Sequence, residues 1–464
     1  MLFSSVTFLY AFLPLTLLAY FVAPKRWRNA VLLTASLIFY FFGEPVYVIL
    51  LFISSINDYF WSLLIEKHRG RQRRMKAYLI ASIAVNLGLL GFFKYADFLI
   101  GSVNAVFGTS IPLTGVPLPI GISFYTFQTM SYTIDVYRGD ARAQRNLATF
   151  ATFVSLFPQL IAGPIVRYTD VAAELESRRS TLEGVALGFR RFAFGLAKKV
   201  LLANAMGELC NAFRESQSPS VLFYWLYAVG YTLQIYFDFS GYSDMAIGLG
   251  GIFGFRFPEN FNYPYISKSI TEFWRRWHMT LSSWFRDYVY IPLGGNRTTR
   301  GKWLRNLAVV WLLTGLWHGA SWNFVLWGAM FGVLLIVEKL WLERSMDRWP
   351  AVLRHVYVLV LVVISFVIFN ASGLSGVRAD LAGLFGLSGL PFSTPETLYY
   401  LRSYAVLLAV CAAASLPLGV KLYRRWQDAK VMTVLEPLAV AVLLALVTAS
   451  LVDGSFNPFL CFRF

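Results

Sequence analysis

The sequence predicts an all-α, polytopic membrane protein with about 11–12 transmembrane helices. Hydrophobic residues make up 57% of the chain and charged residues only 14%, against about 25% charged in an ordinary soluble domain. A span needs about 20 residues, so 464 residues leave room for roughly a dozen spans and their loops. This composition excludes a soluble domain, a disordered chain, a coiled coil and a disulfide-stapled secreted domain.

The net charge of +16 is best explained by membrane topology. Such a charge in a soluble protein would suggest nucleic-acid binding, but the cytoplasmic loops of membrane proteins also collect Lys and Arg. We therefore expect a lipid bilayer, and no nucleic acid, as partner.

The three cysteines, Cys210, Cys411 and Cys461, have neither metal-ligand spacing nor a disulfide pattern, so we expect no metal site.

The first third of the chain contains long apolar stretches separated by basic loops. By length and apolarity, spans are predicted at 3–23, twice within 30–65, at 77–100 and at 120–137. The stretch 3–23 is expected to be a retained span with its N-terminus outside, because its basic residues follow it. A Gly-Glu-Pro turn at 43–45 divides the second stretch. The strongly basic loop 67–76 marks the cytoplasmic side.

Two regions are expected to enter the membrane without crossing it. The segment 149–165 is apolar but lies between basic loops, and two prolines and a glycine interrupt it. A re-entrant segment fits both facts, provided that it is buried in protein or lines a wet cavity. The other region, 265–300, lies within a stretch, 252–305, that holds nine basic and three acidic residues. We place it at the cytoplasmic face, partly within the membrane.

The remaining spans complete a single transmembrane domain, 1–464. They are predicted at 185–209, 221–250, about 306–321, 323–341, 355–371, 404–420 and 432–452. The basic loop 421–430 is expected to be cytoplasmic, which places both termini outside the cytoplasm.

His318 is the clearest candidate for chemistry. It lies in an apolar segment between Arg305 and Glu338, at membrane depth, where an ionisable side chain is a functional candidate by default. The alternative is a hydrogen-bonded packing histidine. Flanking glycines and tryptophans, and the cost of burying a polar ring, favour a functional role.

Two further groups of polar residues stand out. On a continuous helix, Trp274, His278 and Leu281 would share one face, although an amphipathic interface helix would show the same pattern. The segment 234–244 places two carboxylates and several hydroxyls in an apolar span. These groups either line a functional cavity or form a polar network that fixes helix packing.

Six stretches of the sequence together resemble the membrane-bound O-acyltransferase family. They are Met1–Ser4, Phe157–Pro164, Tyr236–Asp244, Phe273–His278, Trp284–Gly295 and Thr314–Trp322. The resemblance covers essentially the whole chain and is nearest to the branch that contains bacterial alginate O-acetyltransferase and the teichoic-acid D-alanylation acyltransferase. It implies a ring of tilted helices around a funnel, with the invariant histidine at His318 and a second conserved polar position at His278.

The resemblance also implies an activity. The chain would take an acyl group, most simply acetyl, from a cytoplasmic thioester and pass it across the bacterial inner membrane for O-acetylation of an extracytoplasmic polysaccharide such as alginate. The expected donor is acetyl-CoA or a carrier-protein thioester, with no bound cofactor. Because the chain has no hydrolase-like soluble domain, a separate extracytoplasmic acetyltransferase would be its partner.

The resemblance assigns roles to particular residues. His318 is expected to be a general base, because a histidine pKa near 6.5 suits proton abstraction at neutral pH; His318 as an acyl carrier is left open. His278 would orient or polarise the donor. The expected donor-binding residues are Trp274, Arg275, Arg276, Trp277, Ser282, Arg286 and Asp287. The expected funnel-lining residues are Asp238, Tyr242, Asp244, Trp317 and Asn323.

Cys461 is a candidate acyl relay, because this branch usually has tyrosine at that position. The alternative is an aromatic anchor at the outer interface.

Two functions other than acyl transfer remain possible for the whole chain. A transporter of the polysaccharide or its precursor would predict inverted repeats, which the sequence does not show. A non-catalytic scaffold of an export complex would leave His318 dispensable.

Overall fold

The computed structural model describes residues 1–454, 456–458 and 460. In that part of the chain every regular element is a helix, as predicted for an all-α protein. The chain divides into two compact units, Met1–Phe192 with Ser243–Pro258, and Ala193–Tyr242 with the described residues from Glu259 onward. The expectation of a single transmembrane domain stays a prediction.

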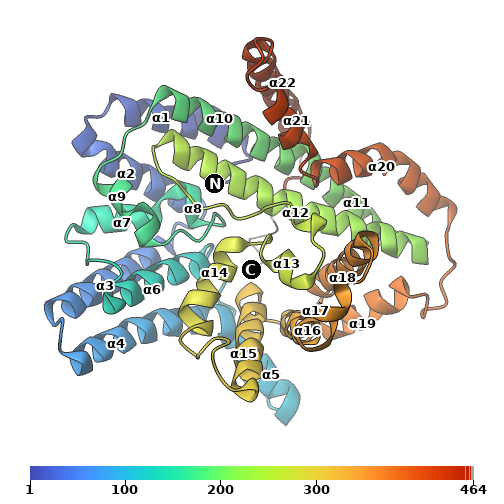
Figure 1. Ribbon diagram of the computed structural model, residues 1–464, viewed down its shortest axis with the longest axis horizontal. Coiled ribbons are helices and arrows are strands. Elements are labelled where there is room, and N and C mark those ends of the chain that lie inside the picture. The colour runs from blue at the N-terminus through green and yellow to red at the C-terminus, as the bar shows by residue number, and fades with distance from the viewer. Residues whose placement is uncertain (455, 459, 461–464) are drawn as a thin grey trace. The chain divides into compact units, whose positions relative to one another are not determined.

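The first unit contains α1 (Leu13–Val22), α2 (Arg28–Phe41), α3 (Val48–Lys67), α4 (Gln72–Leu90), α5 (Ala96–Phe107), α6 (Ile122–Arg138), α7 (Leu147–Ser155), α8 (Phe157–Leu160), α9 (Tyr168–Glu176) and most of α10 (Leu182–Ala197) (Figure 1). The second unit contains α11 (Asn204–Glu215), most of α12 (Val221–Ile252), α13 (Ile270–Trp274), α14 (Met279–Phe285), α15 (Arg300–His318), α16 (Trp322–Val337), α17 (Glu343–Met346), α18 (Ala351–Asn370), α19 (Gly373–Leu384), α20 (Pro395–Ala414), α21 (Leu418–Trp426) and α22 (Met432–Asp453).

Six helices in the described part of the chain are long and apolar enough to cross a membrane. They are Val48–Lys67, Gln72–Phe107, Trp322–Met346, Ala351–Asn370, Pro395–Ala414 and Met432–Asp453. The chain is therefore a multi-pass membrane protein. Other predicted spans fall on helices that are shorter, such as α6 with 17 residues, or richer in tyrosine and polar residues, such as α12.

π-Helical segments interrupt or flank several of these helices. The five in the described residues are Phe8–Phe12, Gly91–Tyr95, Lys198–Ala203, Arg286–Tyr290 and Glu338–Leu342. Such segments are rare and often lie at functional sites. Three of them hold a buried charged side chain, namely Lys94, Lys199 and Glu338.

The predicted re-entrant segment 149–165 is a broken, buried helix pair. α7 ends at Ser155, and α8 begins at Phe157 after a non-helical residue, Leu156. Nearly the whole segment is buried within the first unit. Burial in protein is the condition under which interrupted backbone is tolerated at membrane depth.

Three helices of the first unit, α3, α4 and α6, lie side by side (Figure 1) and share a buried carboxylate. Asp58 of α3 is fully buried. It accepts hydrogen bonds from Asn86 of α4 at 2.8 Å and from Thr133 of α6 at 3.2 Å. A buried carboxylate without such donors would be strongly unfavourable, so the network favours one packing register of the three helices.

Two glycines allow α15 and α16 to pack closely as an antiparallel pair. A Cβ on Gly315 would lie 2.4 Å from the carbonyl oxygen of Phe324, and a Cβ on Gly328 would lie 2.4 Å from that of Trp311. Since a side chain at either position would collide with backbone, only glycine permits this approach. The crossing lies one turn before His318 and so helps to fix where that residue is placed.

Candidate functional site

His318 is the last residue of α15 and lies where the α15–α16 hairpin turns. Its side chain is only 6% exposed, and Nδ1 lies 2.7 Å from the backbone carbonyl oxygen of Thr314. A carbonyl oxygen can only accept a hydrogen bond, so Nδ1 carries the proton of the neutral ring. The basic lone pair is therefore on Nε2, as a general base acting through that atom requires.

His278 does not share a helix face with Trp274 and Leu281, so that prediction is wrong. α13 ends at Trp274 and α14 begins at Met279. Between them, His278 has a left-handed backbone conformation with φ of 43°. A residue in this conformation interrupts a right-handed helix, which redirects the side chain away from the expected face.

A loop residue holds the buried imidazole of His278. Nδ1 of His278 lies 3.0 Å from Oδ1 of Asn260, which also accepts from the hydroxyl of Thr280 at 2.9 Å. His278 therefore donates from Nδ1, and among the described residues its Nε2 has no hydrogen-bond partner. His278 lies outside the six candidate spans, and burial, followed by the effect of His318, lowers its pKa well below the usual value. The neutral ring thus offers an acceptor at Nε2.

Aromatic rings surround both imidazoles. The ring centroid of His318 lies 4.8 Å from that of Trp327, 5.0 Å from that of Trp317 and 5.6 Å from that of Phe369. Trp317 also lies 5.7 Å from His278, so one indole contacts both histidines. These largely edge-on contacts restrict the orientations that the imidazoles can adopt.

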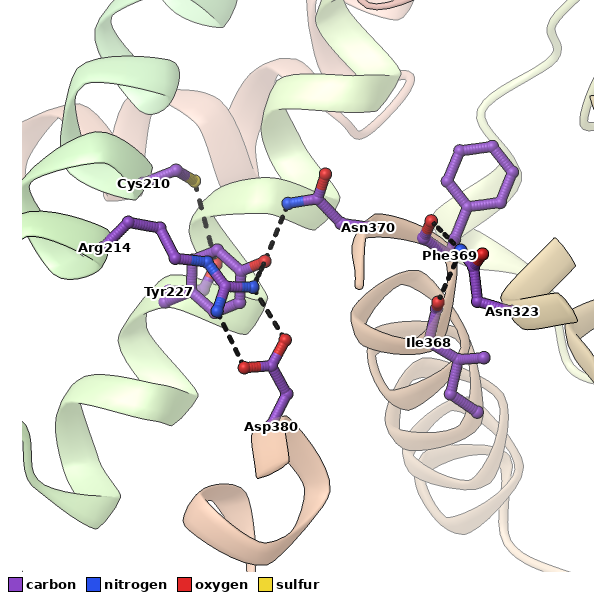
Figure 2. A network of polar contacts seen from close by, with 8 residues as sticks. All are labelled: Cys210, Arg214, Tyr227, Asn323, Ile368, Phe369, Asn370 and Asp380. Atoms are coloured by element: carbon purple, nitrogen blue, oxygen red, sulfur yellow. Dashed lines mark hydrogen bonds and ion pairs between the residues drawn. The ribbon is translucent and has the colours of Figure 1, made fainter. Parts of the chain in front are cut away.

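Asn323 holds the end of α18, the helix that carries Phe369. Asn323 donates from Nδ2 to the carbonyl oxygens of Ile368 at 3.4 Å and Phe369 at 3.0 Å (Figure 2). These carbonyls belong to the last turn of α18, where helix carbonyls lack regular intrahelical donors; among the described residues, the one backbone donor there is the N–H of Ala371, at a long 3.4 Å from the carbonyl oxygen of Ile368. Asn323, predicted to line the funnel, therefore caps α18 beside His318.

The next residue of α18 connects this cap to an ion pair. Asn370 donates from Nδ2 to the hydroxyl of Tyr227 at 2.7 Å, and the same hydroxyl accepts from Arg214 at 2.7 Å (Figure 2). Arg214 binds both carboxylate oxygens of Asp380 at 2.7 Å. Bidentate pairs of this kind fix geometry well, so α11, α12, α18 and α19 are joined around the end of α18.

The predicted donor-binding helix α13 is anchored by a buried acid. Glu338 is 3% exposed and accepts from the backbone N–H groups of Ile270 at 2.6 Å and Thr271 at 3.0 Å. These N–H groups belong to the first turn of α13, where no intrahelical acceptor exists and negative charge is favourable. Glu338 thereby fixes the start of α13 to the helix that follows α16.

The three predicted donor-binding arginines differ in their partners. Arg276 pairs with Glu272 at 2.9 Å, and Arg286 pairs with Asp287 at 2.6 Å. The hydrogen bond to Asp287 is the main cause that raises the pKa of Arg286. Arg275 is exposed, and within the described chain it forms no ion pair. Arg275 is therefore the arginine best able to meet an anionic ligand.

Aromatic contacts connect α13 to His318. The ring of Trp274 lies 5.6 Å from that of Trp327, which itself contacts His318. Trp277 is buried, and Ser282 donates to the carbonyl oxygen of Trp274 at 3.3 Å. The structure thus brings part of the predicted donor-binding group close to His318, while donor binding itself stays a prediction.

The two carboxylates of segment 234–244 have separate basic partners. Asp238 pairs with Lys199 at 2.6 Å in the second unit, and Asp244 pairs with Arg191 at 2.9 Å in the first unit. Tyr242 is buried. The ion pairs favour a role in fixing α12 to its neighbours, and a funnel-lining role for these residues stays a prediction.

Asn260 and Glu338 are the site residues that the sequence analysis missed. The only signal for Asn260 was an amide in a proline-bounded loop, 18 residues from His278. Glu338 was visible only as a charge at the end of an apolar segment. Cys461, the candidate acyl relay, lies outside the described residues.

The comparisons with known proteins identify the family. The model of the membrane-bound O-acyltransferase family matches residues 138–377. The chain is 46% identical over 389 residues to a protein of Azotobacter vinelandii named probable alginate O-acetylase AlgI, covering 83% of this chain and 78% of that protein. It is 35% identical to the peptidoglycan O-acetyltransferase of Helicobacter pylori, covering 84% and 81%. It is 32% identical to the teichoic acid D-alanyltransferase of Bacillus subtilis, covering 54% and 68%. The chain therefore belongs to the membrane-bound O-acyltransferase family and is a multi-pass membrane O-acyltransferase.

Proposed function

We propose that the chain takes an acetyl group from a cytoplasmic thioester and passes it across the bacterial inner membrane for O-acetylation of an extracytoplasmic polysaccharide. Relatives named alginate O-acetylase and peptidoglycan O-acetyltransferase support both the acetyl group and a polysaccharide such as alginate. The observation that carries the chemistry is the bond from Nδ1 of His318 to the Thr314 carbonyl, because it leaves the basic lone pair on Nε2.

In this proposal His318 is a general base. Nε2 takes the proton of an acceptor hydroxyl while the hydroxyl oxygen attacks the thioester carbonyl carbon. The C–S bond then breaks, and the leaving thiolate takes the proton back from His318. The products are an ester and a thiol, and the histidine is regenerated. The surrounding rings of Trp317, Trp327 and Phe369 exclude water, which limits hydrolysis of the thioester.

His278 acts as an orienting group. In its neutral form Nδ1 donates to Asn260, so Nε2 can accept a hydrogen bond but cannot donate one. A thioester carbonyl needs a donor to be polarised. Of the two expected roles, the tautomer therefore favours orientation of a substrate N–H or O–H group by His278.

Charge distribution supports a cytoplasmic donor and an extracytoplasmic acceptor. The loop 67–76 and the region 252–305 are rich in basic residues, which favours a cytoplasmic location for both regions and termini outside the cytoplasm. Arg275 would bind the anionic part of acetyl-CoA or of a carrier-protein thioester. A separate extracytoplasmic acetyltransferase would receive the group and modify the polymer.

The test uses purified protein in vesicles, with labelled acetyl-CoA on one face and the acceptor or partner enzyme on the other. We expect transfer by the wild type and none by His318→Ala, with the variant still folded. His355→Ala is the matched control, because Nδ1 of His355 also binds a carbonyl oxygen, that of Ser267 at 3.1 Å, away from the proposed chemistry.

Each alternative function gives a different result. Near-normal acetylation by His318→Ala would eliminate the general base and support a scaffold. Transfer only when donor and acceptor share one face would eliminate the relay across the membrane and leave a one-sided acyltransferase. Movement of intact polysaccharide without acetyl transfer would identify a transporter.

A further inference from the structure

A buried ion pair of the second unit lies beneath the segment that follows α22. Nζ of Lys199 is 2.6 Å from Oδ1 of Asp238, and the two side chains are 2% and 1% exposed. Lys199 belongs to the π-helical segment Lys198–Ala203 and Asp238 to α12. A pair so deeply buried needs further hydrogen bonds to offset the loss of water.

Segment 456–460, of which Phe456, Asn457, Pro458 and Leu460 are described, supplies those bonds through its backbone. Lys199 donates to the carbonyl oxygen of Pro458. The backbone N–H of Leu460 donates to Oδ2 of Asp238 at 2.9 Å. The Lys199 ammonium thus binds the backbone carbonyl of Pro458. The Asp238 carboxylate binds the backbone N–H of Leu460, two residues further along the chain.

Two further contacts hold the start of the same segment. Nδ2 of Asn204 donates to Oδ1 of Asn457 at 3.2 Å, and Asn204 itself accepts from Lys199 at 2.9 Å. The ring of Phe456 lies against Gly207, where a Cβ would be 2.8 Å from the ring. The helix surface is therefore shaped to admit the segment as well as charged to bind it.

We propose that Lys199 and Asp238 form a docking site for a peptide backbone and that the occupant is this chain's own segment 456–460, through its described residues. Because the two charges contact backbone atoms, the site recognises the direction of a peptide more than its side chains, as in other main-chain recognition modes. Substitutions at position 460 that keep its N–H should therefore be tolerated, whereas changes at Phe456 or Asn457 would remove the side-chain contacts with Gly207 and Asn204.

The position of the site connects docking to acyl transfer, and this part of the inference rests on the proposed function. Phe239 follows Asp238 in α12, and its ring lies edge-on to His278 at 4.7 Å. The docked segment therefore binds the residue that directly precedes a ring packed on His278. Release of segment 456–460 should loosen the packing of Phe239 against His278 and lower the rate of acyl transfer.

The test removes one backbone donor from the intact full-length protein. Leu460→Pro deletes the N–H that binds Asp238 and leaves every membrane helix unchanged, whereas Leu460→Met keeps both the N–H and the size of the side chain. We expect proteolysis within 455–464 to accelerate in Leu460→Pro and to stay at the wild-type rate in Leu460→Met. Equal rates in the two variants would overturn the proposal.

A second pair of variants tests the charges. Asp238→Asn should also expose the segment to protease, whereas Asp244→Asn, which changes the other ion pair of α12, should not. Protection that survives Asp238→Asn in a folded protein would overturn the proposal. His318→Ala separates this inference from the proposed function, because it should lose transfer while the segment stays protected.

Discussion

Replacing Gly315 with alanine inserts one methyl group where α15 and α16 cross. The new Cβ would lie 2.4 Å from the carbonyl oxygen of Phe324 and 3.3 Å from Cα of Gly328. An ordinary contact at this position is about 3.4 Å or longer, so the backbones must separate by about 1 Å. The obstacle is backbone, which cannot rotate away as a side chain could.

Two opposing free-energy terms set the effect on stability. Overpacking of a close contact costs about 1–3 kcal/mol, and alanine in a helix interior is favoured over glycine by about 1 kcal/mol. The net loss of about 0–2 kcal/mol should leave Gly315→Ala folded. Activity should suffer far more, because His318 follows within one turn and a misplacement of about 1 Å can cost about 100-fold in rate.

The assay compares acetyl transfer with thermal unfolding for Gly315→Ala and for Gly301→Ala. Gly301 lies in the first turn of the same helix, with nothing within 4 Å of an added Cβ, so its variant should transfer and unfold like the wild type. Wild-type transfer by Gly315→Ala would refute the idea that the crossing sets the position of His318. An equal loss in both variants would point to a general effect on α15.

Four further variants and one labelling experiment test other parts of the site and the topology. Glu338→Gln should lower the melting temperature, because the first turn of α13 loses charge-assisted bonds worth about 1.5–3 kcal/mol; an unchanged melting curve would contradict this. Asn260→Ala should slow transfer about tenfold or more, because an unpartnered Nδ1 of His278 costs about 1–3 kcal/mol, whereas Asn260→Asp should retain more of the rate. Arg275→Ala should raise the KM for acetyl-CoA with little change in kcat; a change in kcat alone would exclude a donor contact. An impermeant thiol reagent should leave cysteines placed in loop 67–76 unlabelled in intact cells, and labelling there would invert the topology.

The helical membrane fold followed from composition because the bilayer demands long apolar helices. The break at 43–45 was also predictable, since α2 ends at Phe41 and α3 begins at Val48. The number of membrane spans was harder to predict from the sequence. Aromatic and polar residues make α12 less apolar, while its length and burial come from packing that a single sequence does not display.

The sequence singled out His318 and His278 as candidates, but neither their geometry nor the supporting residues Asn260 and Glu338. His318 was evident as an isolated ionisable side chain in apolar sequence. The conformation of His278 was not evident, because neither its φ of 43° nor its contact with Asn260, 18 residues away in the chain, leaves a mark in the local sequence. Glu338 was missed for a similar reason: its partners, Ile270 and Thr271, lie 68 and 67 residues away.

The π-helical segments have a consequence for how this chain compares with its homologues. A π turn corresponds to one residue inserted into an α-helix, and each residue turns an α-helix by about 100°. A homologue with one residue fewer in 198–203 would regain α-helical register, and its lysine would rotate away from the equivalent of Asp238. Single-residue gaps at the three segments that hold Lys94, Lys199 and Glu338 should therefore occur together with loss of the buried charge, which makes such gaps markers of descent as well as of structure.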